Sequence, residues 1–363
     1  MKKKRKMWSN VKIKYLRSLL FLTILFITQA GCQNVKPQQK VSAHSKKTDN
    51  PIHQKISDYL VSKHVFGSVA IVKNKQLIFN EGVGFSNIKK RIVNQSGSTF
   101  PIGSITKLVV ATSIIQLQEK GRLTIQDPVS KYIPSFPNGR EIKLIHLLNH
   151  TSGIKTPLWN QGDRDPSVII KGIGKGSIAF PAGAQWDYND INYLVIGVIV
   201  EKVAGTSLHE YIQKNIFDKA SMSHSGFITR KTPEEFSSIG YRRIAGQVIK
   251  AKQMNIPMLF GCGDIYATAL DVSKFDQALM NGLLVTKDSL KKMLTPGTKS
   301  KYGLGLYIAS NRVFSRGVLS GWEALHVYYQ DKTSIAILLN VHDKKINIHQ
   351  IAKDLYKIIN GKI

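Results

Sequence analysis

A serine and a lysine three residues apart, Ser104 and Lys107, open an apolar run that reaches Leu117. The Pro and Gly before them and the 3.6-residue apolar spacing predict the first turn of a long buried helix. Residues three apart share a helix face, so the lysine nitrogen can reach the serine hydroxyl and activate it as a nucleophile. The helix N-terminus adds partial positive charge and unpaired N–H groups that suit an oxyanion. The pair is a candidate acylation centre, although a helix cap followed by an exposed lysine has the same pattern.

A third reactive group, Tyr188, lies in an Asp- and Asn-rich stretch just before a helix predicted over 192–203. A phenol there can project into a cleft. A nearby lysine ammonium favours its tyrosinate form, so the phenol can shuttle protons. The alternative is a packed aromatic ring with a satisfied hydroxyl. The sequence therefore offers one nucleophile and two proton carriers.

Other candidate chemistry is weaker. His146 and His150 are four residues apart, as zinc ligands can be, but no acidic residue completes the pattern, so we interpret both as structural. Cys262 lies between two glycines and is interpreted as a small turn residue, the alternative being a reactive thiol. The sequence has neither a Gly-x-Ser-x-Gly elbow nor a phosphate-binding glycine loop. We therefore expect no metal, no cofactor and no standard α/β-hydrolase fold.

The elements that must position these groups fall into two kinds. Helical spacing is found over 52–64, 142–148, 192–203, 208–217 and 348–359. A hairpin over 68–79 turns at Asn74-Lys75, and β-rich segments cover 302–309, 313–316, 324–329 and 334–341. Residues 127–134 read as an extended connection and 154–180 as a loop. We predict an α+β fold with an antiparallel sheet from both chain ends, the terminal helices on one face, and a separate helical lobe. The site is expected at the seam between them.

Charge and the N-terminus indicate where the protein works. The 363 residues carry 52 Lys and Arg against 23 Asp and Glu, a net charge of +29 that favours an anionic partner. A basic start and a short apolar run predict a signal peptide over 1–31. Ala30-Gly31-Cys32 resembles a lipobox, although Gln29 stands where Leu is usual. Cys32 is thus a candidate lipidation site, with an uncleaved membrane anchor as the alternative.

The predicted signal peptide divides the remaining chain into two parts. Residues 32–50 are expected to be a flexible tether and 51–363 a single catalytic domain. An exported domain held at the cell membrane by its N-terminus makes nucleic acid an improbable partner despite the charge.

The motif set as a whole resembles a known family. Its members here are Ser104-x-x-Lys107, Leu147 to Gly153, Tyr188-Asn189-Asp190 and Gly261 to Asp264. Over about residues 52–360 the chain resembles the serine β-lactamase and penicillin-binding protein superfamily. It is most similar to the class C-like branch with the secreted PbpX and FmtA type proteins of Gram-positive bacteria. The resemblance implies a β-lactamase/transpeptidase-like fold and a serine acyl-enzyme.

The resemblance also assigns roles. Ser104 would be the nucleophile, Lys107 its base and Tyr188 the second proton-transfer group. Asp190 stands where the family commonly has Asn, and its carboxylate can pair with Lys107, keep it charged and shift base duty to Tyr188.

The third family motif matches Ser315-Arg316-Gly317-Val318, with Gly317 admitting the substrate backbone and the Val318 N–H completing an oxyanion hole. By this resemblance Ser315, Gly317 and Val318 would bind substrate, together with Asp190. The usual Lys or His of this motif is absent. Arg316 should point to the opposite face of its strand.

Three functions remain open on the sequence. The first is a hydrolase acting on D-alanyl substrates of the cell wall or teichoic acid, with β-lactams as covalent inhibitors. The second is a non-catalytic basic protein that binds envelope polymers. The third is a true β-lactamase.

Overall fold

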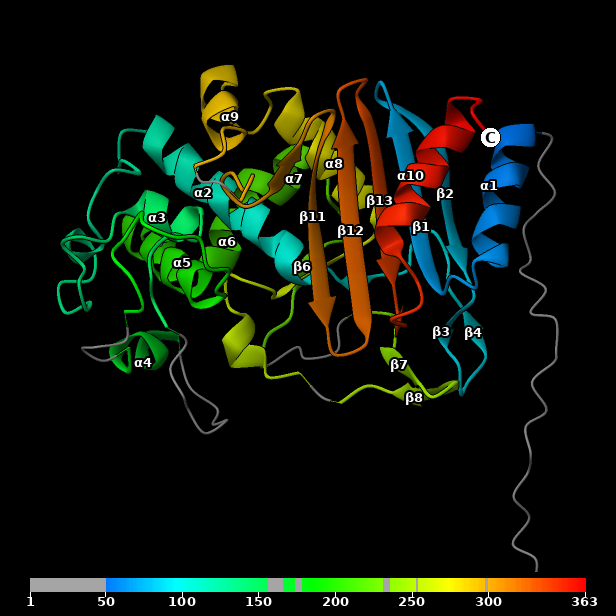
Figure 1. Cartoon of the computed structure of the whole chain (residues 1–363), viewed down its shortest axis with the longest axis horizontal. Coiled ribbons are helices and arrows are strands. Elements are labelled where there is room, and N and C mark those ends of the chain that lie inside the picture. Colours follow the sequence, from blue (N-terminus) through cyan, green and yellow to red (C-terminus); the bar gives the residue numbers. More distant parts are fainter. Residues whose placement is uncertain (1–49, 156–165, 174–177, 231–235, 253, 298–299) are drawn as a thin grey trace, which may run out of the picture. The chain divides into compact units, whose positions relative to one another are not determined.

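The N-terminal hairpin completes a sheet that is otherwise built from the C-terminal third of the chain. The structure is a computed structural model and describes residues 50–155, 166–173, 178–230, 236–252, 254–297 and 300–363. Its main sheet is antiparallel with the strand order β10-β11-β12-β13-β1-β2 (Figure 1). The strands are β1 Gly67–Lys73, β2 Gln76–Val83, β10 Tyr307–Ala309, β11 Arg312–Leu319, β12 Trp322–Tyr329 and β13 Thr333–Leu339. The predicted sheet of N- and C-terminal strands is confirmed.

The first hairpin turns at the predicted residues. Asn74 and Lys75 have positive φ angles of 51° and 66°. Two consecutive left-handed residues match the twist of the flanking strands, and Asn tolerates this conformation better than most residues.

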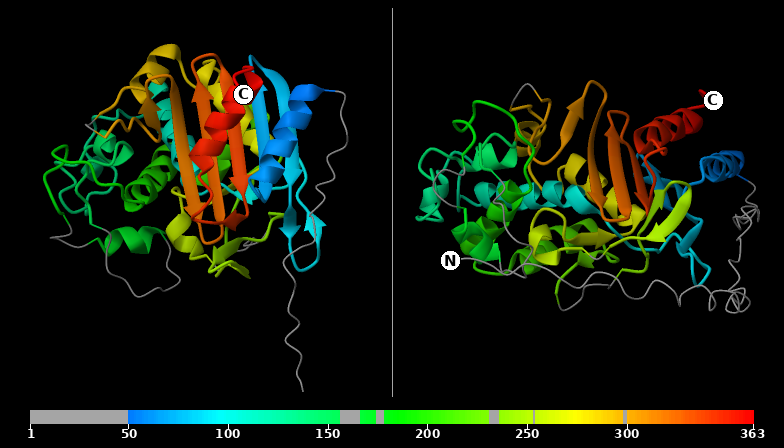
Figure 2. Two further views of the ribbon diagram at one scale, coloured as in Figure 1. Left: turned by 45° about the vertical axis from the view of Figure 1, so that its right-hand side comes forward. Right: turned by 60° about the horizontal axis from the view of Figure 1, so that its bottom comes forward.

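The two faces of the sheet are covered by different helices. The terminal helices α1 (Pro51–Ser62) and α10 (Ile348–Ile359) pack on one face (Figure 2). Their apolar residues, including Leu60 and Leu355, form a core with sheet residues such as Ile337. On the other face lie α2 (Thr106–Glu119) and α8 (Ala269–Met280), within a second and larger core. The predicted placement of the terminal helices is confirmed.

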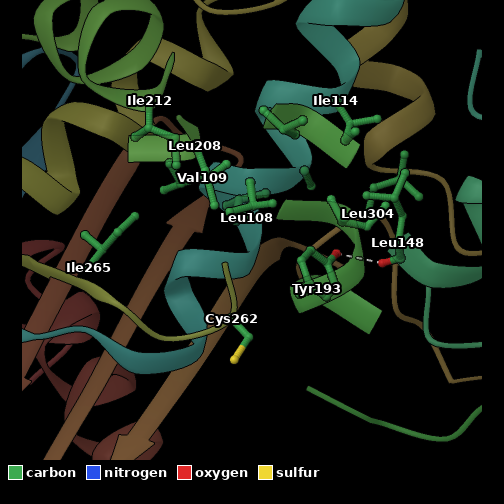
Figure 3. Packing of buried hydrophobic residues seen from close by; sticks show 14 of the residues in the cluster. Leu108, Val109, Ile114, Leu148, Tyr193, Leu208, Ile212, Cys262, Ile265 and Leu304 are labelled. Atoms are coloured by element: carbon green, nitrogen blue, oxygen red, sulfur yellow. Dashed lines mark hydrogen bonds between the residues drawn. The ribbon is translucent and has the colours of Figure 1, made fainter. Parts of the chain in front are cut away.

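The helical lobe lies beside the sheet and packs against the side of α2 that does not face the sheet. It contains α3 Leu144–Leu148, α4 Pro166–Lys171, α5 Ile191–Ala204, α6 Leu208–Ile212, α7 Asp218–Ala220 and α9 Lys287–Met293. Leu108 and Val109 of α2 lie near Leu208 and Ile212 of α6 in the lobe (Figure 3). Every residue of α2 from Thr106 to Leu117 is buried. The helix that follows Ser104 is therefore the central element between the two parts of the fold.

Several expected elements have different limits. The predicted helix 208–217 ends at Ile212 and continues as a π-helical turn, Gln213–Phe217. Val129–Lys131 forms a 3-10 turn inside the connection expected to be extended. The strand expected from 302 begins only at Tyr307, because Gly305 has a left-handed φ of 89°. The described part of 154–180 contains α4, a helix where a loop was expected.

Smaller elements complete the fold, and the sequence analysis anticipated none of them except Val341, which ends the predicted segment 334–341. They are β3 Phe85–Asn87, β4 Ile92–Val93, β5 Phe100–Pro101, β6 Gly226–Phe227, β7 Tyr241–Ile244, β8 Gln247–Lys250, β9 Ile265–Ala267, β14 Val341–His342 and the 3-10 turn Ile256–Leu259. In the described part of the chain, no single helix has the length and apolarity to cross a membrane. One pair, Ile191–Ala204 with Leu208–Ala220, meets that test only together and is bent by 77°. The predicted signal peptide, Cys32 and the tether as far as residue 49 lie outside the described residues, and Asn50, the last tether residue, is the N-cap of α1.

Candidate active site

Ser104 lies in a 3-10 turn, Gly103–Ile105, that leads directly into α2. The turn requires glycine at 103, whose φ is 52°. A Cβ there would lie 3.2 Å from both the Gly317 Cα and the Val318 nitrogen of β11. The predicted position of Ser104 at a helix start is therefore confirmed. Its turn is pressed against the later part of β11, which β10 does not cover because β10 pairs only with residues 312–314.

Lys107 is fully buried and binds three oxygens. Its Nζ donates to Ser104 Oγ at 2.9 Å and to the Cys262 carbonyl at 2.9 Å, and it lies 2.8 Å from Asp190 Oδ1. These contacts use all three N–H groups of an ammonium. Burial alone would lower the pKa of Lys107, but the oxygens of Tyr188 and Asp190 outweigh it and raise this pKa above its usual value. Lys107 is therefore a charged donor to Ser104.

The carbonyl of Cys262 is a site component that sequence reasoning missed. It is presented by a tight turn in which Gly261 has a φ of 67° and donates its N–H to Asp264 Oδ1 at 3.2 Å. The thiol itself is only 2 % exposed and lies 3.1 Å from the Met258 carbonyl oxygen. Burial raises the pKa of this thiol. The side chain is thus packed in the turn, as expected, and the backbone makes the contact to Lys107.

Tyr188 and Asp190 flank a buried anchor, Asn189. The Asn189 backbone N–H donates to His150 Nδ1 at 3.2 Å, and its side-chain amide donates to the Ile154 carbonyl at 2.7 Å. The Tyr188 ring packs 4.3 Å from the His150 ring, and Lys107 Nζ lies 5.1 Å from the Tyr188 centroid. Because Asn189 is fixed, its two neighbours are held beside Lys107 at the start of α5.

His150 positions this segment and remains neutral. Its Nδ1 accepts from Asn189, so the ring proton is on Nε2, which is buried without a hydrogen-bond partner. Burial, and then the charge of Lys107, lower the pKa of His150 well below its usual value. His146 instead accepts the backbone N–H of Lys143 on its Nδ1 at 3.2 Å. Both histidines make contacts within the fold, in agreement with the structural interpretation.

The edge of β11 faces the Ser104 turn. A Cβ on Gly317 would lie 2.0 Å from the Ile102 carbonyl oxygen and 2.8 Å from the Ser104 nitrogen. Leu319 pairs with Trp322 across a two-residue turn, and the residues that flank such a turn form a hydrogen-bonded pair. Because hydrogen-bonded and non-hydrogen-bonded pairs alternate along antiparallel strands, the next pair, Val318 with Glu323, is not hydrogen-bonded. The N–H of Val318 therefore points away from β12, toward the free edge. The backbone nitrogens of Ser104 and Val318 are thus close together, as an oxyanion hole requires.

The other two residues of this motif face elsewhere. Ser315 is buried, and its hydroxyl donates to the Gly305 carbonyl at 3.1 Å. Arg316 lies on the opposite face of β11, where its Nε is 2.7 Å from Glu323 Oε1. The Glu323 carboxylate is itself buried and also contacts His342. The expectation that Arg316 points away from the site is confirmed.

A cavity of about 420 Å³ opens beside these groups. Tyr188 and Asp190 line one side, and Met254, Met258 and Leu319 contribute apolar surface. Its walls come from the start of α5, the 3-10 turn 256–259 and the end of β11, so it lies at the predicted seam between sheet and lobe. The cavity is thus bounded by Tyr188 and Asp190, and Asp190 is joined to Ser104 through Lys107.

Known proteins resemble this chain in sequence and in fold. The Beta-lactamase family model matches residues 52–347. The chain is similar to the candidate penicillin-binding protein PbpX of Bacillus subtilis (strain 168), with 36% identity over 91% of this chain and 86% of the relative. It is 30% identical to the teichoic acid D-alanine hydrolase of Staphylococcus aureus (strain MRSA252), over 85% of this chain and 79% of the relative. The crystal structure of FmtA from Staphylococcus aureus aligns with a TM-score of 0.78 and 27% identity, over 87% of this chain and 91% of that chain.

Proposed function

The chain belongs to the β-lactamase family of serine hydrolases, and from this premise we propose that it hydrolyses D-alanyl substrates of the cell envelope through an acyl-enzyme on Ser104. The observation that carries the proposal is the 2.9 Å hydrogen bond from the buried Lys107 ammonium to Ser104 Oγ, beside the edge of β11. Acyl transfer needs a nucleophile, a cation and oxyanion donors, and the Ser104 hydroxyl, the Lys107 ammonium and the N–H groups of Ser104 and Val318 would supply them.

In the proposed acylation step, Tyr188 starts as a phenolate beside the Lys107 ammonium. Ser104 Oγ attacks the substrate carbonyl carbon, and its proton passes to the Tyr188 phenolate oxygen. Lys107 is charged and donates all its N–H groups, so it stabilises the alkoxide and does not accept that proton at the start. The N–H groups of Ser104 and Val318 bind the oxyanion. The bond to the leaving oxygen then breaks, and Tyr188 returns the proton to it.

In the proposed deacylation step, water adds to the Ser104 ester. The Tyr188 oxygen takes the proton of that water and returns it to Ser104 Oγ as the acid is released. Asp190 holds Lys107 in place through both steps.

The proposed leaving group is an alcohol of an anionic wall polymer. A cation on β11 beside the site would bind a substrate that ends in a free carboxylate, and here Arg316 is turned away and paired with Glu323. An ester such as D-alanyl teichoic acid has no carboxylate beside the bond to be broken. The net charge of +29 suits a polyanion, and one relative carries the name teichoic acid D-alanine hydrolase.

We further propose that the domain works outside the cytoplasm and is held to the membrane by its N-terminus. Residues 1–31 would be the signal peptide, Cys32 the lipidated residue and 32–50 the tether. β-Lactams would act as slow covalent inhibitors at Ser104.

The test is release of D-alanine from D-alanylated teichoic acid by the purified domain, with muropeptides as the competing substrate. We expect release from the polymer and none with Ser104→Ala. Activity on muropeptides alone would show that the substrate is a peptide and not the proposed ester. Equal binding of the polymer by both proteins with no release would favour the non-catalytic envelope protein. Rapid turnover of nitrocefin would identify a β-lactamase.

A further inference from the structure

The cavity lined by Tyr188 and Asp190 differs in charge from the protein as a whole. The chain carries 52 Lys and Arg, yet among the described residues that line this cavity there is no Lys or Arg. Its one acidic side chain is Asp190, which is 57% exposed although its partner Lys107 is fully buried. Lys107 contacts Oδ1 on the buried side of Asp190, so the carboxylate lies between the Lys107 ammonium and the cavity. An acyl group that enters the cavity meets negative charge first.

The Asp190 carboxylate is also close enough to Ser104 to contact an acyl group bound there. Asp190 Oδ1 and Ser104 Oγ are bound to the same Nζ, at 2.8 Å and 2.9 Å. The two oxygens are therefore at most two hydrogen-bond lengths apart. In an aminoacyl ester, the α-nitrogen is two covalent bonds from the carbonyl carbon, and Ser104 attacks that carbon. An α-ammonium is thus within reach of the second carboxylate oxygen while the carbonyl is in place.

We propose that Asp190 binds the free α-ammonium of the acyl group, so that the site selects aminoacyl esters over esters whose α-substituent is neutral or blocked. This inference rests on the proposed hydrolysis and names its substrate class. The side chain of a small amino acid would pack against the apolar wall at Met258 and Leu319. The outer surface attracts the anionic polymer, and the cavity then accepts the cationic group that the polymer carries.

Asp190→Asn tests the proposal, because it removes the charge with little change of shape. The substrates are the D-alanyl and the D-lactyl ester of glycerol, which differ only in an ammonium against a hydroxyl group. The ammonium also makes its ester intrinsically more reactive. The measured quantity is therefore the change, on substitution, in the ratio of the two kcat/KM values, from which intrinsic reactivity cancels. Loss of a charge-assisted hydrogen bond predicts a fall in this ratio of about fivefold to tenfold.

The outcomes separate the two proposals. Asp190→Asn also loosens Lys107, which lowers both rates but leaves their ratio unchanged if Asp190 does not contact the substrate. An unchanged ratio would overturn the ammonium site while leaving the hydrolase intact. No hydrolysis of either ester by the native chain, with no adduct on Ser104, would overturn the proposed function itself. Asp288→Asn, an exposed carboxylate in the first turn of α9, is the matched control and should leave the ratio unchanged.

Discussion

Gly317→Ala should disable acyl transfer through the backbone, without touching any reactive side chain. The added Cβ would lie 2.0 Å from the Ile102 carbonyl oxygen and 2.8 Å from the Ser104 nitrogen. Both contacts are to backbone atoms, so β11 and the Ser104 turn must move apart. The N–H groups of Ser104 and Val318 would then no longer converge on one oxyanion.

The magnitude follows from what such donors contribute. Loss of one oxyanion-hole donor typically lowers kcat by about 10²- to 10³-fold. Overpacking a close contact of this kind costs about 1 to 3 kcal/mol of stability. We therefore expect at least a 100-fold fall in kcat for ester hydrolysis, with a folded protein whose Tm is lower by several degrees. Initial rates and a thermal melt on the same preparation measure both.

Gly97→Ala is the control, because a Cβ there has nothing within 4 Å and Gly97 does not have a positive φ. It should change neither rate nor melting temperature. If Gly317→Ala kept its acylation rate within about threefold of the native protein, the edge of β11 would not form the oxyanion hole. The assignment of Val318 would then be wrong.

Three further predictions concern individual side chains. Tyr188→Phe should lower ester hydrolysis by about 10²- to 10⁴-fold with little loss of stability, since the ring can keep its packing on His150; activity near the native level would remove Tyr188 from the proton path. Cys262→Ser should retain most of the activity, because the contact to Lys107 is made by the backbone carbonyl. The native thiol should resist iodoacetamide until the protein unfolds, and rapid labelling would contradict the packed position. The folded state keeps His150 neutral because its pKa is well below 6.5, whereas the unfolded chain takes up a proton near pH 6.5. Stability should therefore fall as the pH drops below about 6.5, and urea unfolding should show a shallower pH dependence for His150→Asn.

Much of the fold was predictable because its signals are local. The amphipathic helix 348–359 and the turn at Asn74-Lys75 follow from spacing and turn chemistry, and both are confirmed. The division into a sheet from both chain ends and a helical lobe follows from the order of these segments. The short helix α4 and short strands such as β3, β4 and β6 gave no clear periodicity, so sequence patterns could not reveal them.

The site was predictable where its residues share one helix turn or one loop. Ser104 and Lys107 meet because they are three apart on a helix, and the pairing of Asp190 with Lys107 was expected from charge. The Cys262 carbonyl could not be foreseen, because any residue supplies a backbone oxygen and only the tertiary fold aims it at Lys107. The buried orientation of the Ser315 hydroxyl likewise depends on the tertiary fold, because this hydroxyl donates to the carbonyl of Gly305, ten residues earlier in the chain.

The central claim is that Ser104 forms a covalent acyl-enzyme. Intact-protein and peptide mass spectrometry after incubation with a fluorescent penicillin tests it most directly. We expect one added acyl group, located on the peptide that contains Ser104 and absent from Ser104→Ala. An unmodified native protein, or a label that persists in Ser104→Ala, would contradict the account.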